Sequence, residues 1–296
     1  MSQARERLLA TLEQLGVTAK KSLGQNFLVS DVVIGRIIDQ VKAFKPDSLI
    51  EVGPGPGALT YFLKQMEVPL QLIELDRVIA AYWREQGIPV IEEDALRLDW
   101  EQFYSTPVGS SAETGRTGIP AGVQAGATRN IVFVSNLPYQ ISSSIVIERS
   151  LDEVGVQHMV LMFQKEVAQR IRAVAKSEHY GLLSVIAQTF WKTEMVTEAG
   201  PRDFSPPPKV NSRVLAFTRI PTEIKNRKAF LTFVKAGFAQ RRKLLKSNLS
   251  GLLNQKKLTE EQLIGWLAEL GFKETARAEE LSPVQFVKLY QKFGFE

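Results

Sequence analysis

The sequence predicts an α/β protein in which a parallel sheet with helices is followed by a small all-helical domain. From Ser48 onwards, short apolar segments alternate with amphipathic ones, a pattern typical of buried parallel strands joined by helices. A glycine-rich turn follows the first of these strands. After Pro221 the strand patterns stop and only helical patterns follow. These three observations define the expected architecture.

Two helices are expected before the sheet, over about 1–15 and from about 31 to 44, separated by the basic segment KKSLGQNFLVS (20–30). The expected strands are 48–52, 69–75, 89–93, 130–136, 157–163, 191–200 and 212–220. The expected helices between them are 57–66, 77–87, 140–151, 164–174 and 181–190. We expect four more helices after residue 226.

Residues 105–129 consist mainly of Gly, Ser, Thr, Pro and Ala, which cannot supply a core. We therefore expect a flexible surface insertion there. The predicted domains are residues 1–205, which contain the sheet, and residues 206–296, which are helical.

Composition excludes several classes of protein. The 296 residues are 44% hydrophobic and 23% charged, unlike a disordered, collagen-like or coiled-coil chain. The absence of cysteine excludes a thiol nucleophile and a Cys-based metal site. Only two histidines are present, which makes a metal site built from several histidines improbable. With no long apolar run and no secretory leader at the N-terminus, we expect a cytoplasmic protein without a membrane span or a metal.

The positive charge is concentrated near the C-terminus. Residues 221–296 hold 14 Lys and Arg against 8 Asp and Glu, a net of +6, so the rest of the chain carries a net of −1. This asymmetry indicates a polyanionic partner. The cluster Arg241, Arg242, Lys243 and Lys246 is expected on a helix and is predicted to contact RNA phosphates, as are Lys20 and Lys21. The alternative is a solvated, charged helix face.

The segment EVGPGPGALT (51–60) lies where a strand ends and a helix begins. Gly53, Gly55 and Gly57 allow a sharp turn and a close approach to a ligand. The spacing differs from the dinucleotide fingerprint, and the two prolines remove N–H donors that a pyrophosphate would need. The segment therefore favours a cofactor without a pyrophosphate, unless it is only a tight turn.

Acidic residues end the next two strands. Glu74 is placed to accept hydrogen bonds from ribose hydroxyls, and Asp94 to accept one from the amino group of adenine. Together with the glycine turn, they fit S-adenosylmethionine better than NAD. The alternative interpretation is that both carboxylates only cap the helices that follow.

The fourth strand ends in SNLPYQISS, which suits methyl transfer to the amino group of adenine. The N6 lone pair is delocalised into the ring, so N6 is a poor nucleophile. The Asn136 side-chain oxygen and the carbonyl of Leu137 or Pro138 can accept both N6–H bonds and favour a tetrahedral nitrogen, and the proline fixes the backbone. Tyr139 offers a stacking face for an extruded base.

These motifs, with KKSLGQNFL (20–28), MFQKEVAQRI, FSPPPKVNS (204–212) and FAQRRKLLKSNL (238–249), resemble one family over nearly the whole chain. It is the family of bacterial small-subunit ribosomal RNA adenine N6,N6-dimethyltransferases, whose loss gives kasugamycin resistance. The resemblance implies a Rossmann-like S-adenosylmethionine-dependent methyltransferase domain. The implied cofactor-binding residues are Asn26, Leu28, Gly53, Glu74, Asp94 and Asn136.

The resemblance also implies a substrate, two adjacent adenosines in a hairpin near the 3′ end of 16S rRNA, within an immature small ribosomal subunit. Each would become N6,N6-dimethyladenosine. Asn136 and Tyr139 would hold the adenine, and Phe163 would offer a second stacking face. We expect the protein to act as a monomer. The long insertion at 105–129 departs from the family and puts contacts made there in doubt.

Two other functions stay open at this stage. A related enzyme would methylate large-subunit rRNA and confer antibiotic resistance. A non-catalytic ribosome assembly factor would keep the fold only to bind RNA. A dehydrogenase is disfavoured by the glycine spacing.

Overall fold

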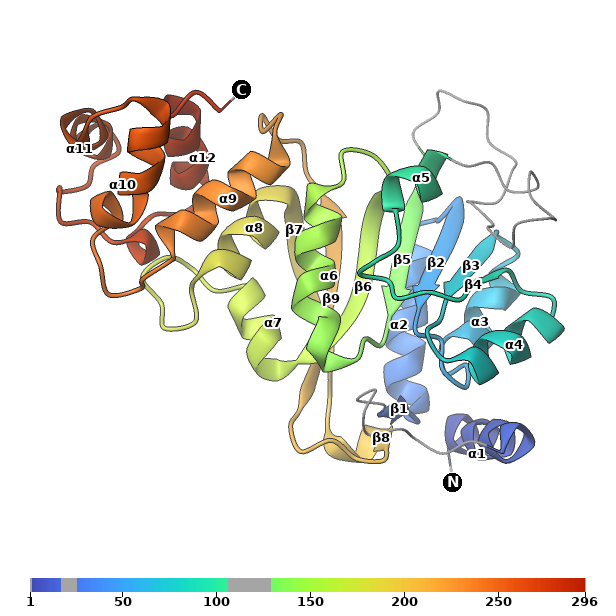
Figure 1. Ribbon diagram of the computed structural model, residues 1–296. Coiled ribbons are helices and arrows are strands. Elements are labelled where there is room, and N and C mark those ends of the chain that lie inside the picture. The colour runs from blue at the N-terminus through green and yellow to red at the C-terminus, as the bar shows by residue number, and fades with distance from the viewer. Residues whose placement is uncertain (1, 17–25, 106–128, 296) are drawn as a thin grey trace. The chain divides into compact units, whose positions relative to one another are not determined.

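The computed structural model describes residues 2–16, 26–105 and 129–295. The chain forms two compact units (Figure 1). The first comprises Met1–Ala168 and Thr193–Arg219, and the second comprises Gln169–Lys192 and Ile220–Glu296. This division differs from the expected boundary between residues 205 and 206.

The first unit is built on most of a seven-stranded sheet. Its order is β4 (Val90–Ile91), β3 (Leu70–Ile73), β2 (Ser48–Val52), β5 (Ile131–Ser135), β6 (Val156–Gln164), β9 (Ser212–Arg219) and β7 (Trp191–Ala199). Strands β4, β3, β2, β5 and β6 pair in parallel, whereas β9 pairs antiparallel with β6. Each strand lies within or close to a segment that the sequence predicts, which confirms the α/β prediction.

The expected domain boundary is wrong because β9 lies beyond it. After the proline-containing segment 206–208 the chain returns to the sheet, and β9 pairs with β6 along most of its length. The strand begins with two polar residues and continues as an apolar run, whose buried Val214, Leu215 and Phe217 join the core. The segment FSPPPKVNS is therefore a connection within the first unit.

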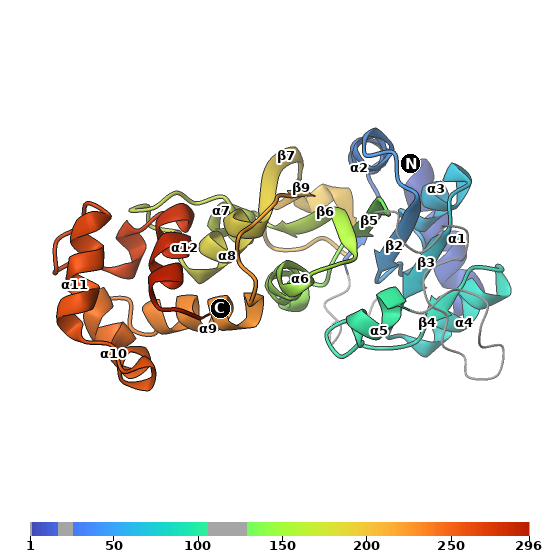
Figure 2. The same cartoon turned by 90° about the horizontal axis from the view of Figure 1, so that it is seen from above.

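Helices flank this sheet: α1 (Gln3–Leu15), α2 (Asp31–Ala43), α3 (Thr60–Leu63) with the 3₁₀ turn η2 (Lys64–Met66), α4 (Arg77–Glu85), α5 (Trp100–Ser105), α6 (Tyr139–Leu151) and α7 (Lys165–Ile171). Figure 2 shows α2 and α6 on opposite faces of the sheet. With both faces covered, every residue of β2, β3 and β5 is buried. Helix α5 was not predicted, because six residues carry too little periodicity.

A short pairing outside the main sheet ties distant segments together. Strand β1 (Phe27–Leu28) pairs antiparallel with β8 (Phe204–Ser205). The amide of Val29 also donates to the carbonyl of Asp203 at 2.8 Å. Figure 1 shows this pair beside α1, near the edge where the parallel strands end. We call this edge the carboxyl edge and the opposite one the amino edge.

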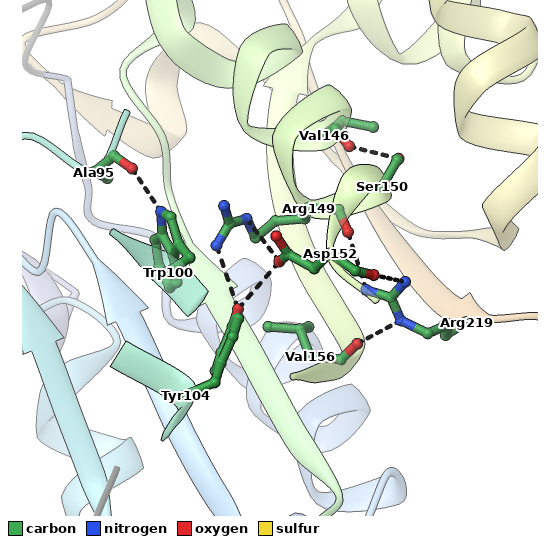
Figure 3. A network of polar contacts seen from close by, with 9 residues as sticks. All are labelled: Ala95, Trp100, Tyr104, Val146, Arg149, Ser150, Asp152, Val156 and Arg219. Carbon is green, nitrogen blue, oxygen red and sulfur yellow. Dashed lines mark hydrogen bonds and ion pairs between the residues drawn. The ribbon is translucent and has the colours of Figure 1, made fainter. Parts of the chain in front are cut away.

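A buried charged network lies at the amino edge (Figure 3). The Arg149 guanidinium lies 3.7 Å from the centre of the Trp100 ring, forms an ion pair with Asp152 at 3.3 Å and donates to the Tyr104 hydroxyl. Arg219 donates to the backbone carbonyls of Arg149, Asp152 and Val156. The network joins α5, the end of α6 and the start of β6, so it fixes this edge of the sheet.

The second unit is helical, with α8 (Leu182–Phe190), α9 (Arg227–Gly237), α10 (Leu245–Lys256), α11 (Glu260–Glu269), the 3₁₀ turn η4 (Ala278–Glu280) and α12 (Pro283–Lys292). The rings of Phe230, Phe233, Phe286 and Tyr290 form its core, with centroids 5.2–6.5 Å apart where they meet. Capping boxes begin α11 at Thr259 and α12 at Ser282. Among the described residues, no helix is long and apolar enough to cross a membrane.

Candidate active site

A pocket opens at the carboxyl edge of the sheet, entirely within the first unit. Its wall combines the glycine turn, strand β1 with Asn26, the ends of β2, β3 and β5, and α1. It contains most of the residues predicted to bind the cofactor or the base: Asn26, Leu28, Gly53, Gly55, Glu74, Asn136, Pro138 and Tyr139. The structure thus brings together side chains that are up to 113 residues apart in the sequence.

The glycines of the turn serve different purposes. Gly53 has a φ of +65°, and a Cβ there would have only Pro138 within 4.0 Å, so the backbone itself faces the pocket. At Gly57 a Cβ would meet the Trp83 ring at 2.5 Å, which makes this glycine a packing requirement. The Trp83 indole donates to the carbonyl of Gly55 at 2.8 Å and holds the turn in place.

Glu74 is fixed by the backbone. Its Oε2 accepts from the amide of Gly55 at 3.2 Å, and its Oε1 accepts from the amide of Asp76 at 2.9 Å. Burial raises the pKa of Glu74, and these two amides oppose the rise. Each carboxylate oxygen can accept a second hydrogen bond, so the arrangement presents a pre-oriented acceptor to the pocket.

Glu51 is a pocket residue that the sequence interpretation missed. Its side chain is 2% exposed, and Oε2 is buried with no hydrogen-bond partner among the described residues. Burial raises the pKa of Glu51 to about 8; the neighbouring Thr60 side chain opposes this rise, and the charge of Glu74 adds to it. The available signal was an acidic residue inside the otherwise apolar strand SLIEV, directly before the glycine turn.

Asn136 and Tyr139 lie where β5 passes into α6. The Asn136 amide nitrogen donates to the carbonyl of Asn26 at 3.2 Å, which orients the side chain and leaves its Oδ1 as an acceptor. Pro138 immediately precedes α6, and its carbonyl accepts from the amide of Ile141 at 3.1 Å. The Tyr139 hydroxyl lies 2.8 Å from that of Ser212.

Two predicted site residues lie elsewhere. Phe163 is 0% exposed and packs against Phe217 with ring centroids 5.9 Å apart, so its prediction as a stacking face is wrong. It belongs to the core because β6 is covered on both faces. Asp94 is outside the pocket wall. Its Oδ1 accepts from the amide of Leu96 at 2.9 Å in a turn that precedes α5, so Asp94 does not cap that helix, which begins only at Trp100.

The basic residues also differ from expectation. Lys20 and Lys21 lie outside the described residues. The expected helix over the C-terminal cluster is wrong at its start, because α10 begins only at Leu245. Arg241 forms an ion pair with Glu279 at 3.0 Å, and Lys246 with Glu260 at 2.8 Å. Arg242 and Lys243 are exposed, without an ion-pair partner among the residues that the structure describes.

The chemistry of the wall fits an organic cation that also carries hydrogen-bond donors. Two buried carboxyl groups, one of them with an oxygen that has no partner among the described residues, lie beside a turn that exposes its backbone. In residues 2–16, 26–105 and 129–295, no three His, Cys, Asp or Glu side chains gather as metal ligands. The strand order, the antiparallel β9 and this pocket define a Rossmann-like methyltransferase.

The particular family follows from comparison with known proteins. The sequence profile of the ribosomal RNA adenine dimethylase family matches residues 16–293, and the chain belongs to this family. The ribosomal RNA small subunit methyltransferase A of Bdellovibrio bacteriovorus is 70% identical over 296 residues, covering 100% of both chains. The protein of the same name from Staphylococcus haemolyticus is 31% identical over 294 residues, covering 97% of this chain and 94% of its own.

Solved structures share the fold. A dimethyladenosine transferase from Plasmodium falciparum superposes with a TM-score of 0.67 at 21% identity, covering 90% of this chain and 98% of its own. The 23S rRNA methyltransferase ErmE has a TM-score of 0.59 at 22% identity, covering 91% and 100%. At these identities the likeness supports the Rossmann-like fold alone.

Proposed function

We propose that the protein transfers methyl groups from S-adenosylmethionine to N6 of two adjacent adenosines in a hairpin near the 3′ end of 16S rRNA. Each adenosine becomes N6,N6-dimethyladenosine. The observation that carries the proposal is the Asn136 amide, whose oriented oxygen shares one pocket wall with Glu74 and the glycine turn. The family and the relative that is 70% identical support the choice of small-subunit rRNA.

Different residues of the pocket would bind different parts of the cofactor. Glu74 would accept from the ribose hydroxyls, while Glu51 would offer its buried Oε2 to the positive charge of the methionine part. Asn26, Leu28, Gly53 and Gly55 would complete the cofactor wall. Asp94, which is partly exposed, stays a predicted acceptor for the adenine amino group of the cofactor. When bound, S-adenosylmethionine supplies a methyl group on a sulfonium, which is strongly electrophilic.

The chain would make N6 of the target adenine a better nucleophile. The Oδ1 of Asn136 accepts one N6–H bond because its amide nitrogen is already held by Asn26. Since the carbonyl of Pro138 accepts from the amide of Ile141, the carbonyl of Leu137 is the better acceptor for the second N6–H. Tyr139 would stack on the extruded base. Positioning supplies most of the rate, and the proton released from N6 passes to water.

The second unit would dock the RNA. In the C-terminal cluster, Arg242 and Lys243 are the better candidates for binding phosphates, because Arg241 and Lys246 are already paired with carboxylates. Arg242→Gln with Lys243→Gln should weaken binding of small-subunit RNA and reduce the salt-dependence slope by about 0.9 for each phosphate that is no longer neutralised. Arg241→Gln with Lys246→Gln is the matched control and should change the slope less. Equal slopes for the two pairs would contradict this assignment.

The substrate would be 16S rRNA within an immature small subunit, and the enzyme would act in the cytoplasm, where ribosomal subunits are assembled. Because a single chain supplies the whole pocket wall, a monomer suffices for catalysis.

A methyl-transfer assay tests the proposed function. Unmethylated small subunits and naked 16S and 23S rRNA are incubated with labelled S-adenosylmethionine, and the modified nucleosides are identified by mass spectrometry. We expect N6,N6-dimethyladenosine at two neighbouring positions of 16S rRNA, most efficiently in the subunit. Label only in 23S rRNA would show the large-subunit alternative. No label in any substrate would support an assembly factor without catalysis.

A further inference from the structure

The segment 204–212 contacts the active site at both of its ends. At its start, Phe204 and Ser205 pair with Leu28 and Phe27, which line the pocket. At its end, Ser212 begins β9 and pairs with Gln164, the last residue of β6. Because β9 runs antiparallel to β6, it begins at the carboxyl edge, where β5 ends and Tyr139 follows. The topology therefore brings Ser212 to Tyr139 across 73 residues of sequence.

The contact between these residues is well defined. The Ser212 side chain is 0% exposed, and its hydroxyl lies 2.8 Å from the hydroxyl of Tyr139. Tyr139 itself lines the pocket, whereas Ser212 does not. Burial raises the pKa of Tyr139, so its hydroxyl stays protonated at neutral pH and can donate or accept.

We propose that Ser212 is a positioning residue that sets the orientation of the Tyr139 ring on which the target adenine stacks. This inference rests on the proposed function of Tyr139. The backbone at the start of α6 fixes one end of the ring's long axis, and Ser212 fixes the other. Ser212 touches neither the base nor the cofactor. It acts through Tyr139, by holding the ring where an extruded base meets it in a productive orientation.

The test compares four variants of the full-length protein in methyl transfer to unmethylated small subunits. Ser212→Ala and Tyr139→Phe each remove the same hydrogen bond from opposite sides. Either change should lower kcat about 3- to 10-fold, the effect of one net hydrogen bond. The double variant should be no slower than the slower single variant, because the bond can be removed only once. Ser212→Thr keeps a hydroxyl and should recover most of the rate.

Two further measurements separate positioning from a structural role. S-adenosylmethionine affinity, measured by titration calorimetry, should be unchanged in Ser212→Ala. A hairpin RNA with 2-aminopurine at the target position should show weaker quenching of its fluorescence, because the base stacks less well. Ser150→Ala is the matched control, since Ser150 is buried in the same α6 and its hydroxyl bonds the carbonyl of Val146. It should leave kcat and quenching unchanged.

Additive losses in the double variant would overturn the proposal, as would a Ser212→Ala rate equal to that of an active wild type. If Ser212→Ala does not fold, Tyr139→Phe decides, because it removes one oxygen from a half-buried ring. A wild type that does not methylate 16S rRNA would contradict the proposed function. The proposal for Ser212 is tested separately, by the ratio of the kcat of each variant to the kcat of the wild type.

Discussion

At the amino edge of the sheet, buried charges form an ion pair, whereas at the carboxyl edge a buried acid has no ion-pair partner among the described residues. Arg149 is 2% exposed and meets Asp152, Tyr104 and the Trp100 ring. Glu51 is equally buried, yet no described residue forms a hydrogen bond with its Oε2. Breaking a buried ion pair is costly, whereas a buried carboxyl without a cation stays protonated until a cationic ligand favours its ionised form. The contrast separates the structural edge from the functional edge.

The largest expected effect is at the amino edge. Arg149→Met should destabilise the protein by about 3 kcal/mol or more, because it leaves Asp152 buried with its closest cation removed. Urea unfolding measures this loss. The exposed pair of Arg84 and Glu92 is the control, and Arg84→Met should cost less than about 1 kcal/mol.

The pH dependence of this loss follows from Asp152. Burial raises the pKa of Asp152 to about 6, although two arginines oppose the rise. Below that pKa the carboxyl takes up a proton and no longer needs a cation. The destabilisation by Arg149→Met should therefore be larger at about pH 8 than at about pH 5. A loss independent of pH would show that packing on Trp100, rather than the ion pair, is the main contribution.

The next-largest effect is expected at Asn136, and Asn130, at the opposite end of β5, is its control. Asn136→Ala should lower the single-turnover rate about 100-fold, because the amide oxygen acts on N6 at the moment of attack. Some loss of cofactor affinity is expected as well. Asn130 precedes β5 and donates to the carbonyls of Phe44 and Lys45. Asn130→Ala should lower stability but not the rate, and the reverse pattern would contradict the comparison.

A smaller effect is expected at Glu74. Glu74→Ala should weaken S-adenosylmethionine binding by about 1.5–3 kcal/mol, since a charge-assisted acceptor for the ribose is lost. Titration calorimetry measures this change. Glu92→Ala removes an exposed carboxylate that pairs with Arg84, and it should leave the affinity unchanged. An unchanged affinity in a folded Glu74→Ala variant would remove Glu74 from the site.

Much of the carboxyl edge was predictable from the sequence, because parallel strands bring their last residues to one edge. This rule alone is enough to place Gly53, Glu74 and Asn136 together. It fails at Phe163, which also ends a strand, because burial depends on what covers the strand. It also misses Ser212, whose place depends on an antiparallel strand that the sequence could not orient.

The basic cluster illustrates a second limit. The partners of Arg241 and Lys246 are Glu279 and Glu260, from segments that only tertiary folding brings near. The sequence shows the positive charges but not which of them are neutralised. It likewise shows Glu51 in an apolar strand but not that its Oε2 has no hydrogen-bond partner among the described residues.

Glu51 provides the most direct test of the central claim, that the carboxyl edge keeps a buried acid, without an ion-pair partner among the described residues, for a cationic cofactor. The pKa of about 8 means that Glu51 is mostly protonated in the free protein at neutral pH. A bound cation favours the ionised form, so binding should release protons. The affinity for S-adenosylmethionine should also rise as the pH is raised from about 6 to about 8.

Titration calorimetry of wild type and Glu51→Gln with S-adenosylmethionine, in buffers of different ionisation enthalpy at about pH 7, measures that release directly. The wild type should release a fraction of a proton approaching one. The variant should bind more weakly and release fewer protons, with a flatter pH dependence. Equal affinity and equal proton release in the two proteins would contradict the claim that Glu51 is held for the cofactor.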